Sequence, residues 1–268
     1  MRNTSQKGSK GFSRIYLSSK KMDNIVCDDC FDFLPTLPSG SVDLTICDLP
    51  FGTTQCPWDS CLPLDKLWNE LWRVSKPTSP VLMFASQPFT SVVVSSNIKN
   101  FRYEWIWEKS KASNFLDAKK KPLKAHESLL VFCRQGAVYH PQMSSGDSYK
   151  ARPGKKPTDI YGKVNDLMLR NDNDGLRYPR SVVYFKTAES EGKVIHSTQK
   201  PTALLEYMLK TYTVEGDTVL DPCFGSGSLL VAAKSTSRVA VGCEKDKNTF
   251  DKAMQRIEQL PNNIFDEC

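Results

Sequence analysis

The chain has 268 residues, of which 40% are hydrophobic and 25% are charged, and its formal net charge is +6. These values fit one globular domain or one domain with a sizeable insertion, and the longest wholly apolar runs, such as residues 81–85, are far shorter than the ~20 residues of a membrane-spanning helix. Because no apolar stretch follows the first basic residues and the nine cysteines lack the spacing of a disulfide framework, we expect an intracellular protein with reduced thiols.

The first half of the chain predicts a basic arm followed by alternating strands and helices. Residues 1–21 contain six basic residues, no acidic residue and five serines, which is typical of a flexible arm. Beyond it, short apolar runs predict strands and amphipathic spacing predicts helices. In chain order we expect a strand at 24–27, a helical turn at 31–34, a strand at 42–47, a helix at 64–74, and strands at 81–85, 103–107 and 128–133.

Residues 135–194 break this pattern and are interpreted as an insertion. They are rich in Gly, Pro, Asp, Asn, Lys and Arg, and only residues 181–185 resemble a strand. The wider region 101–193 holds eighteen Lys and Arg against eleven Asp and Glu, whereas the rest of the chain holds eighteen against nineteen. This excess favours contact with a polyanion, and a solvated basic surface is the other interpretation.

Regular spacing returns after the insertion. It predicts a helix at 201–212, a strand at 218–220, a helix at 228–234, a strand at 239–242 and a helix at 247–260. Strands that alternate with helices are typical of a mainly parallel sheet. We therefore predict one α/β domain, formed by residues 22–134 and 195–268, with residues 135–194 inserted into it.

A glycine-rich turn follows the predicted strand at 218–220. In this turn Gly225 and Gly227 allow the backbone to bend tightly and approach a ligand, while Glu244, at the tip of the next strand, can accept hydrogen bonds from two ribose hydroxyls. Leu230 stands where a dinucleotide-binding turn has its third glycine, which disfavours NAD. The pattern favours a nucleoside site, and a plain glycine-rich turn with an exposed acid is the alternative.

A second group, Asp48-Leu49-Pro50-Phe51, follows the predicted strand at 42–47. The carboxyl end of a strand is where α/β sheets bind their ligands. Asp48 and the Leu49 carbonyl would accept the two hydrogens of an exocyclic amine, and Phe51 would stack on the ring that carries this amine. The alternative is a proline turn that ends the strand and leaves Asp48 exposed.

Together these two groups resemble the amino-group DNA methyltransferases that use S-adenosylmethionine. Residues 48–51 are similar to the family's catalytic Asp-Pro-Pro-Tyr loop, with Leu and Phe replacing Pro and Tyr, and residues 221–227 are similar to its Phe-x-Gly-x-Gly cofactor loop. His196-Ser197-Thr198-Gln199-Lys200-Pro201 is similar to the family's His-Pro-Thr-Gln-Lys-Pro element. The catalytic loop precedes the cofactor loop with a basic irregular region between them, an order that resembles the circularly permuted β-group.

The resemblance covers about residues 23–260 and implies a fold, a cofactor and site residues. The implied fold is a Rossmann-like, mainly parallel sheet of the S-adenosylmethionine-dependent methyltransferase type, with residues 135–194 as a basic target-recognition insertion. The implied catalytic residues are Asp48, Leu49, Pro50 and Phe51. The implied cofactor-binding residues are Asp28, Thr198, Lys200, Asp221, Phe224, Gly225, Gly227, Ser228 and Glu244. The implied DNA-binding residues are Lys109, Lys111, Asn114, Lys119, Lys120, Lys121, Lys124, Arg152, Lys155, Lys156, Arg177 and Arg180.

The function that this resemblance implies is sequence-specific methylation of DNA at the exocyclic N6 of a flipped adenine. Asp rather than Ser at position 48 favours adenine, and cytosine N4 is the nearest competing acceptor. Two further hypotheses are a non-catalytic DNA-binding protein on the same fold and a methyltransferase that acts on RNA or on a protein amide.

The expected partners and location follow from the same resemblance. We expect double-stranded DNA as substrate, with a homodimer and a paired restriction endonuclease as further partners, and no membrane association. The location would be the cytoplasm or nucleoid of a bacterium, or the host cell of a virus. We expect no metal, because the sulfonium already activates the methyl carbon and Cys27-x-x-Cys30 has no second pair at zinc-finger spacing.

Overall fold

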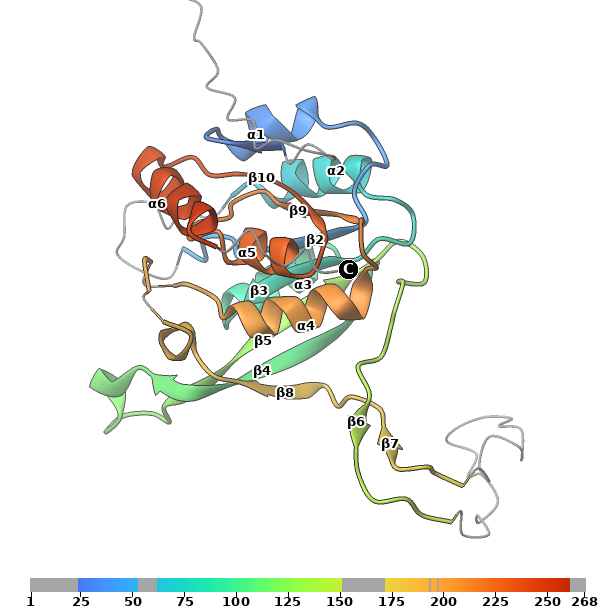
Figure 1. The fold of residues 1–268 in the computed structure, drawn as a ribbon. Helices are drawn as coiled ribbons and strands as arrows, with labels where there is room; N and C mark the ends of the chain where they lie inside the picture. Colours follow the sequence, from blue (N-terminus) through green and yellow to red (C-terminus); the bar gives the residue numbers. More distant parts are fainter. Residues whose placement is uncertain (1–23, 53–61, 151–171, 193, 197, 261–268) are drawn as a thin grey trace, which may run out of the picture.

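The structure is a computed structural model that describes residues 24–52, 62–150, 172–192, 194–196 and 198–260. The predicted arm at 1–21 lies outside these residues. Within them, eight strands form one sheet in the order β1-β10-β9-β2-β3-β5-β4-β8 (Figure 1). Its strands are β1 (Asn24–Val26), β2 (Leu44–Cys47), β3 (Val81–Ala85), β4 (Phe101–Ser113), β5 (Lys124–Phe132), β8 (Val182–Phe185), β9 (Thr218–Asp221) and β10 (Val239–Cys243).

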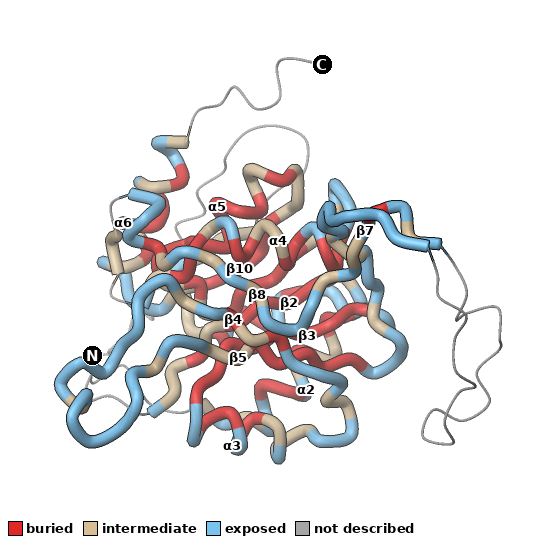
Figure 2. Tube along the Cα trace, turned by 90° about the horizontal axis from the view of Figure 1, so that it is seen from below, coloured by how far each residue is buried: buried red, intermediate tan, exposed pale blue. Residues whose placement is uncertain are grey.

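Helices cover both faces of this sheet. They are α1 (Cys30–Phe33), α2 (Leu64–Val74), α3 (Phe89–Ser96), α4 (Thr202–Tyr212), α5 (Ser228–Ser235) and α6 (Lys247–Glu258). Figure 2 shows three layers, with α4 and α5 on one side of the sheet and α2 and α3 on the other. Among the residues described, no helix is long and apolar enough to cross a membrane.

Two hydrophobic cores result from the alternation of side chains along the strands. On β3, Leu82 and Phe84 point into the core under α4, α5 and α6, whereas Met83 and its neighbours Val81 and Ala85 point into the core under α1, α2 and α3. Strands buried on both faces are expected to be continuously apolar, and the sequences of β2 and β3 largely follow this rule.

The strand directions place the ends of the central strands at one edge of the sheet. β1, β10, β9, β2 and β3 are parallel to one another, β5 runs antiparallel to β3 and β4, and β8 is parallel to β4. The carboxyl ends of β2, β9 and β10 therefore meet at the edge where the amino end of β5 also lies. The predicted mainly parallel sheet is confirmed.

The structure differs from the predicted elements in three places. α3 is absent from the predicted elements, because its three successive valines favour a strand, yet Phe89 and Val93, one helical turn apart, are buried against the sheet. β4 and β5 are longer than expected and form one long hairpin. In the segment assigned to the insertion, β8 joins the main sheet, and β6 (Ser144–Ser145) and β7 (Leu176–Arg177) form a separate ribbon.

Candidate active site

The two predicted loops lie side by side because β2 and β9 are neighbouring parallel strands. Leu44 pairs with Val219, so the loop that begins at Asp48 and the turn that begins at Asp221 leave the same edge of the sheet. The Cys223 thiol donates a hydrogen bond to the main-chain carbonyl of Asp48 across 3.7 Å. Two groups that are far apart in the sequence thus form one site.

Asp48 is held by a buried network of charged side chains. Lys200 Nζ lies 2.6 Å from Asp48 Oδ2 and 3.3 Å from Glu127 Oε2, and Lys109 donates to the other oxygen of Glu127. The side chains of Lys200 and Glu127 are only 10% and 12% exposed. Glu127 Oε2 has no aligned hydrogen bond, so its contact with Lys200 is ionic.

The network fixes the charge of its members. Burial lowers the pKa of Lys200, but the charges of Asp48 and Glu127 outweigh burial and leave its pKa above the ordinary value. Burial raises the pKa of Glu127, but Lys200 and Lys109 outweigh burial and leave its pKa below the ordinary value. Burial raises the pKa of Asp48, and Lys200 opposes that rise. Lys200 therefore stays protonated, and its charge is what keeps Asp48 available as an anion.

Phe51, the predicted stacking residue, is half-buried and rests on a second ring. The Phe51 and Phe89 rings stack with centroids 5.0 Å apart and planes inclined by 24°. Phe89 begins α3, directly after the carboxyl end of β3. The stack fixes the orientation of the Phe51 ring, and its role toward a base stays a prediction.

The glycine-rich turn uses its two glycines for different purposes. Gly225 (φ +51°) and Gly227 (φ +70°) both have the left-handed conformation that glycine favours. A Cβ at Gly225 would meet no atom within 4 Å, so this part of the turn faces open space. A Cβ at Gly227 would come within 3.2 Å of the Ala253 side chain on α6. Gly225 therefore leaves room for a ligand, and Gly227 permits close packing of the helix.

Three acidic residues, Asp28, Asp221 and Glu244, lie at the carboxyl ends of β1, β9 and β10, next to this turn. The Gly225 amide donates to Glu244 Oε2 over 2.9 Å, and the Asp28 amide donates to the Glu244 carbonyl over 3.1 Å, which brings the ends of β1 and β10 together. Burial, followed by the nearby charges of Asp48 and Glu244, raises the pKa of Asp221 to about 8 despite the Cys223 amide that it accepts. These acids and the open face of Gly225 fit S-adenosylmethionine, which carries two positive charges and a ribose with two hydroxyls.

Other predicted cofactor residues have different surroundings. The Phe224 ring is buried against Phe250, with centroids 5.9 Å apart, so its main chain rather than its ring faces the turn. The Ser228 hydroxyl accepts a hydrogen bond from Arg256 on α6 over 3.0 Å. Thr198 is exposed, and its hydroxyl lies 2.9 Å from His196 Nδ1. The roles of these residues toward the donor stay predictions.

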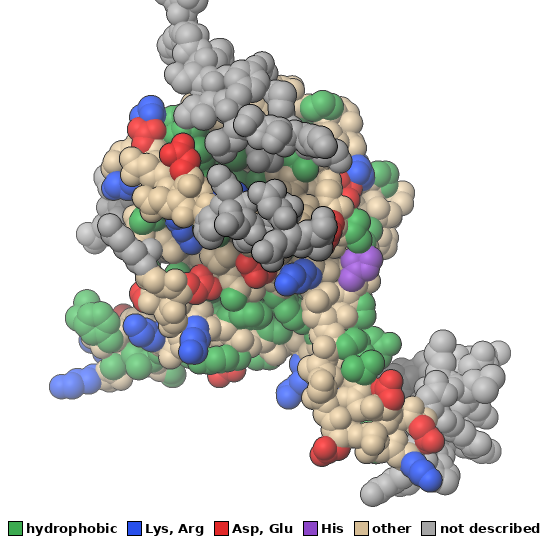
Figure 3. Space-filling model, viewed as in Figure 1, with side chains coloured by type: hydrophobic (Ala, Val, Ile, Leu, Met, Phe, Trp, Pro, Cys, Tyr) green, Lys and Arg blue, Asp and Glu red, His purple; other side chains and the backbone are tan. Residues whose placement is uncertain are grey.

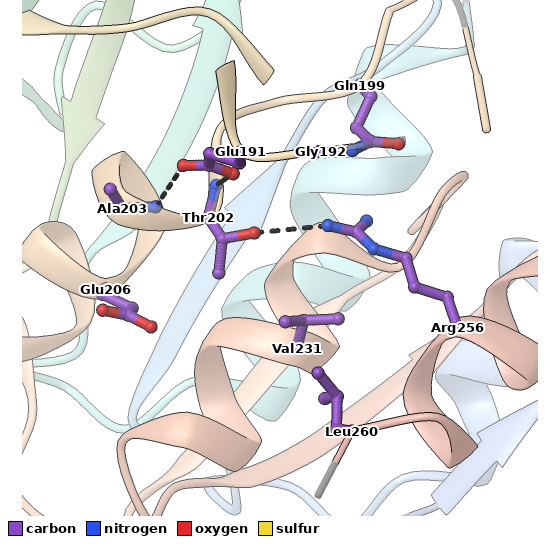
Figure 4. A pocket seen from close by; sticks show the side chains of 9 residues that line it. All are labelled: Glu191, Gly192, Gln199, Thr202, Ala203, Glu206, Val231, Arg256 and Leu260. Atoms are coloured by element: carbon purple, nitrogen blue, oxygen red, sulfur yellow. Dashed lines mark hydrogen bonds between the residues drawn. The ribbon is translucent and has the colours of Figure 1, made fainter. Parts of the chain in front are cut away.

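Arg256 carries no signal in the sequence, although it joins three parts of the site. Its guanidinium donates to the Ser226 carbonyl over 3.1 Å, in addition to Ser228. It also donates to the Thr202 hydroxyl over 3.3 Å (Figure 4). Glu191 accepts from the first two amides of α4, and it lines, with Arg256, a cavity of about 400 Å³ behind the turn. No sequence motif marks Arg256, since a basic residue on a terminal helix is ordinarily a surface residue.

Among the residues that the structure describes, the predicted DNA-binding residues divide into three groups. Lys109 joins the charged network, and Lys124, which pairs with Ser113 at the start of the tip of the β4–β5 hairpin, contacts Ser86. Lys111, Asn114, Lys119, Lys120 and Lys121 are exposed nearer its tip. Arg177 packs over Tyr149 in the β6–β7 ribbon and Arg180 is exposed. The predicted residues that lie outside the described part of the chain are Arg152, Lys155 and Lys156.

The cysteine pair and the histidines do not form a metal-binding group. Cys27 is exposed, whereas Cys30 is buried, and burial raises the pKa of the Cys30 thiol to about 11. Among the residues described, no cluster of three or more His, Cys, Asp or Glu side chains is arranged to hold a metal ion.

Comparisons with known proteins place this site in a family. A family model described as DNA methylase matches residues 42–255. The type II methyltransferase M.HpaI of Haemophilus parainfluenzae is 26% identical over 269 aligned residues, covering 90% of this chain and 81% of that protein. The M1.HpyAVI–SAM complex has a TM-score of 0.58 at 21% identity and covers 87% of this chain and 98% of that one. The cytosine-N4-specific PvuII DNA methyltransferase has a TM-score of 0.65 at 13% identity, covering 94% and 92%.

These similarities confirm the predicted Rossmann-like α/β fold and the prediction of DNA methylation. S-adenosylmethionine, the predicted donor, is the ligand of the M1.HpyAVI complex. The family model spans N6 and N4 methylases alike, so the adenine assignment and the circular permutation stay predictions.

Proposed function

This chain belongs to the DNA methylase family, and we propose that it transfers a methyl group from S-adenosylmethionine to the exocyclic N6 of an adenine flipped out of duplex DNA. The type II relatives support methylation at a specific sequence. The observation that carries the proposal is the direct contact between the Asp48 loop and the glycine-rich turn through Cys223. This contact puts the acceptor of an amine and the proposed donor site side by side.

The residues of the Asp48 loop would hold the target base. Extrusion of a base from the duplex costs roughly a few kcal/mol, and contacts between the base and the pocket must offset this cost. The Phe51 ring, supported by Phe89, stacks on the base, while the Asp48 carboxylate and the Leu49 carbonyl accept the two hydrogens of the exocyclic amine. These hydrogen bonds draw the nitrogen lone pair out of conjugation with the ring and direct it away from the protein's acceptors.

The donor and the charged network then act together. When bound, S-adenosylmethionine would supply a methyl group attached to a positively charged sulfur, and the carbon–sulfur bond that breaks as the nitrogen–carbon bond forms leaves the neutral thioether S-adenosylhomocysteine. Lys200 holds the Asp48 carboxylate in one position through its 2.6 Å ion pair. Because the Asp48 carboxylate is already in place to accept the amine's hydrogen bond, it need not move as the amine nitrogen attacks the methyl carbon. This preorganisation is how the site would lower the barrier.

We assign adenine N6 as the methylated atom because this chain resembles enzymes in which Asp, rather than Ser, at the position of Asp48 favours adenine. Cytosine N4 is the second candidate, because its exocyclic amine offers the same two hydrogens and because the PvuII enzyme, a structural relative, is cytosine-N4-specific. Both candidates use the same acceptors and the same donor, so one product analysis distinguishes them.

The test is to incubate the protein with isotopically labelled S-adenosylmethionine and unmethylated duplex DNA, digest the DNA to nucleosides and identify the labelled product by mass. We expect labelled N6-methyl-deoxyadenosine. Labelled N4-methyl-deoxycytidine would keep the chemistry and reject the base assignment. Parallel reactions with RNA and with peptides test the remaining acceptors.

Variants connect the product to the site. Asp48→Asn removes the charge of the proposed acceptor at constant shape and should abolish transfer while the protein still binds DNA. Asp65→Asn makes the same chemical change at an exposed position of α2 and should leave transfer intact. Equal activity of both variants would show that transfer does not depend on a hydrogen bond from the amine to the Asp48 carboxylate.

A further inference from the structure

The β4–β5 hairpin extends well beyond the rest of the sheet. β8 pairs with β4 only as far as Lys109, whereas β4 continues to Ser113, which pairs with Lys124 of β5. Residues 114–123 form the tip, and Figure 1 shows the hairpin projecting away from the helices. A long projection of this kind is not required by either hydrophobic core.

The tip is an ordered turn rather than a loose loop. Asn114 has the left-handed conformation (φ +67°), and the amide of Asp117 donates to the Asn114 carbonyl over 3.0 Å. The short 3-10 helix η2 (Phe115–Asp117) follows, and the Lys120 amide closes the turn on the Asp117 carbonyl over 2.7 Å. Lys121 also forms a 3.0 Å ion pair with Asp117.

This ordered turn presents two large apolar side chains to the solvent. Phe115 is 76% exposed and Leu116 is 85% exposed, the highest values of any large hydrophobic side chain that the structure describes. Figure 3 shows hydrophobic side chains at the outer end of this projection with basic side chains close by. Exposed apolar groups on a rigid support are characteristic of a binding surface, since they contribute nothing to the stability of the isolated chain.

The surrounding charge identifies the partner as a polyanion. Residues 109–124 contain six lysines and one acidic residue, Asp117. The base of the same hairpin carries Lys109, which belongs to the network beside Asp48. Beyond the pair Glu108–His126, β5 continues for only two residues to Lys124, which pairs with Ser113, so the ladder extends by about 7 Å at roughly 3.3 Å per residue, and Phe115 follows in the turn. That extension corresponds to about two base pairs of duplex at roughly 3.4 Å each, to which the turn adds.

We propose that Phe115 and Leu116 form an apolar wedge that inserts between base pairs of the duplex, within a few base pairs of the target base, while Lys119 and Lys120 bind the flanking phosphates. Insertion of apolar side chains at a base step unstacks it and kinks the duplex, which would assist extrusion of the nearby target. The inference rests on the proposed function only in taking duplex DNA as the substrate.

The first test is the affinity for a mixed-sequence, unmethylated duplex at several salt concentrations. The double variant Phe115→Ala, Leu116→Ala should bind between roughly 5-fold and 150-fold more weakly, the range that loss of base stacking gives, with an unchanged salt dependence. Lys119→Gln, Lys120→Gln should instead reduce the slope of log affinity against log salt by about 0.9 per lost phosphate contact.

A matched control separates the wedge from a general loss of apolar surface. Ile98→Ala, Val214→Ala removes two exposed apolar side chains, 65% and 54% exposed, that precede β4 and β9 at the opposite edge of the sheet. It should bind DNA like the wild type. Thermal unfolding of all three variants checks that each one folds.

The second test detects unstacking directly. Permanganate oxidises thymines that have lost their stacking, so the wild-type complex should show reactive thymines at a base step away from the methylated position. The Phe115→Ala, Leu116→Ala complex should lose this reactivity at protein concentrations that saturate the DNA. The control variant should retain it.

The outcomes are distinguishable from failure of the proposed function. Wild-type affinity and reactivity in the wedge variant would overturn the inference even where DNA is methylated. The wedge variant could also convert a dimer to a monomer and leave DNA binding unchanged. That result would assign the tip to an interface between two copies of the chain and would overturn the inference. Binding and unstacking that depend on the wedge, without methyl transfer to any DNA, would support the inference and reject the proposed function.

Discussion

Replacement of Glu127 by Gln tests the charged network that holds Asp48. The substitution keeps the shape of the side chain and removes the one negative charge between Lys109 and Lys200. At 3.3 Å and an effective dielectric constant of about 20, the attraction between Glu127 and Lys200 is on the order of 5 kcal/mol before desolvation is counted. Removal of one partner of a buried ion pair typically lowers the free energy of unfolding by about 3–5 kcal/mol. We expect the lower figure, because Lys200 still has its ion pair with Asp48.

The pH dependence gives this prediction its sign. Lys200 and Lys109 outweigh burial and hold the pKa of Glu127 below its ordinary value of 4.5 in the folded protein. A lowered folded pKa means that the stabilising contribution is complete above the unfolded pKa and is lost as the pH falls through the folded pKa. The deficit of Glu127→Gln should therefore be constant above about pH 5.5 and disappear at lower pH.

Urea unfolding at a series of pH values measures this deficit. Glu215→Gln changes an exposed acid at the amino end of β9 in the same way and should alter the free energy of unfolding by less than about 0.5 kcal/mol. Lys109→Gln added to Glu127→Gln removes the cation that has lost its partner and should restore part of the stability. A deficit that does not shrink as the pH falls below the ordinary pKa of 4.5, or none at neutral pH, would refute the network as its origin.

Three further predictions concern the two loops. Phe51→Ala should raise the KM for DNA more than the dissociation constant for S-adenosylmethionine, and Phe89→Ala should repeat this effect more weakly; equal losses for both ligands would contradict the stacking role. Gly227→Ala and Gly225→Ala should both destabilise the fold by about 1–3 kcal/mol through backbone strain, with the larger loss at Gly227 because of crowding against Ala253, and only Gly225→Ala should also weaken donor binding in calorimetry. Because burial raises the pKa of Asp221 to about 8, the affinity for the cationic donor should increase as the pH rises toward 8, and Asp221→Asn should remove that increase.

The parts of the fold that the sequence predicts are those whose pattern is local. The helix at 64–74 and the strand at 81–85 match α2 and β3 because their periodicity and apolar runs are set by their own burial. The two loops can be placed at one edge of the sheet because all the parallel strands of a sheet have their carboxyl ends at the same edge, however far apart they are in the sequence. Trp105 and Trp107 share a buried face, as their spacing of two residues along a strand predicts.

Helix α3 and Arg256 show where local pattern fails. Three successive valines have a preference for strands, but two apolar side chains at helical spacing, Phe89 and Val93, gain more from burial against the sheet than the preference costs. Arg256 has no neighbour in sequence that marks it. Its partners, Ser226 and Thr202, are 30 and 54 residues away, so only the folded chain brings them within hydrogen-bonding distance.

The charged network could not be predicted because it depends on the direction of β5. In a mainly parallel sheet, polar residues that begin a strand lie at the edge opposite to the ligand site, and Glu127 lies near the beginning of β5. β5 runs antiparallel to β3, pairing Ser128 with Ala85, so its amino end reaches the carboxyl edge beside Asp48 and Lys200. The same reversal makes β4 and β5 a hairpin, which gives one element both a buried counter-charge at its base and an exposed apolar tip. An interpretation that treats every strand as parallel assigns the lysines of residues 109–124 to the DNA surface alone. The antiparallel pairing of β4 and β5 also places Lys109 in the charged network beside Asp48.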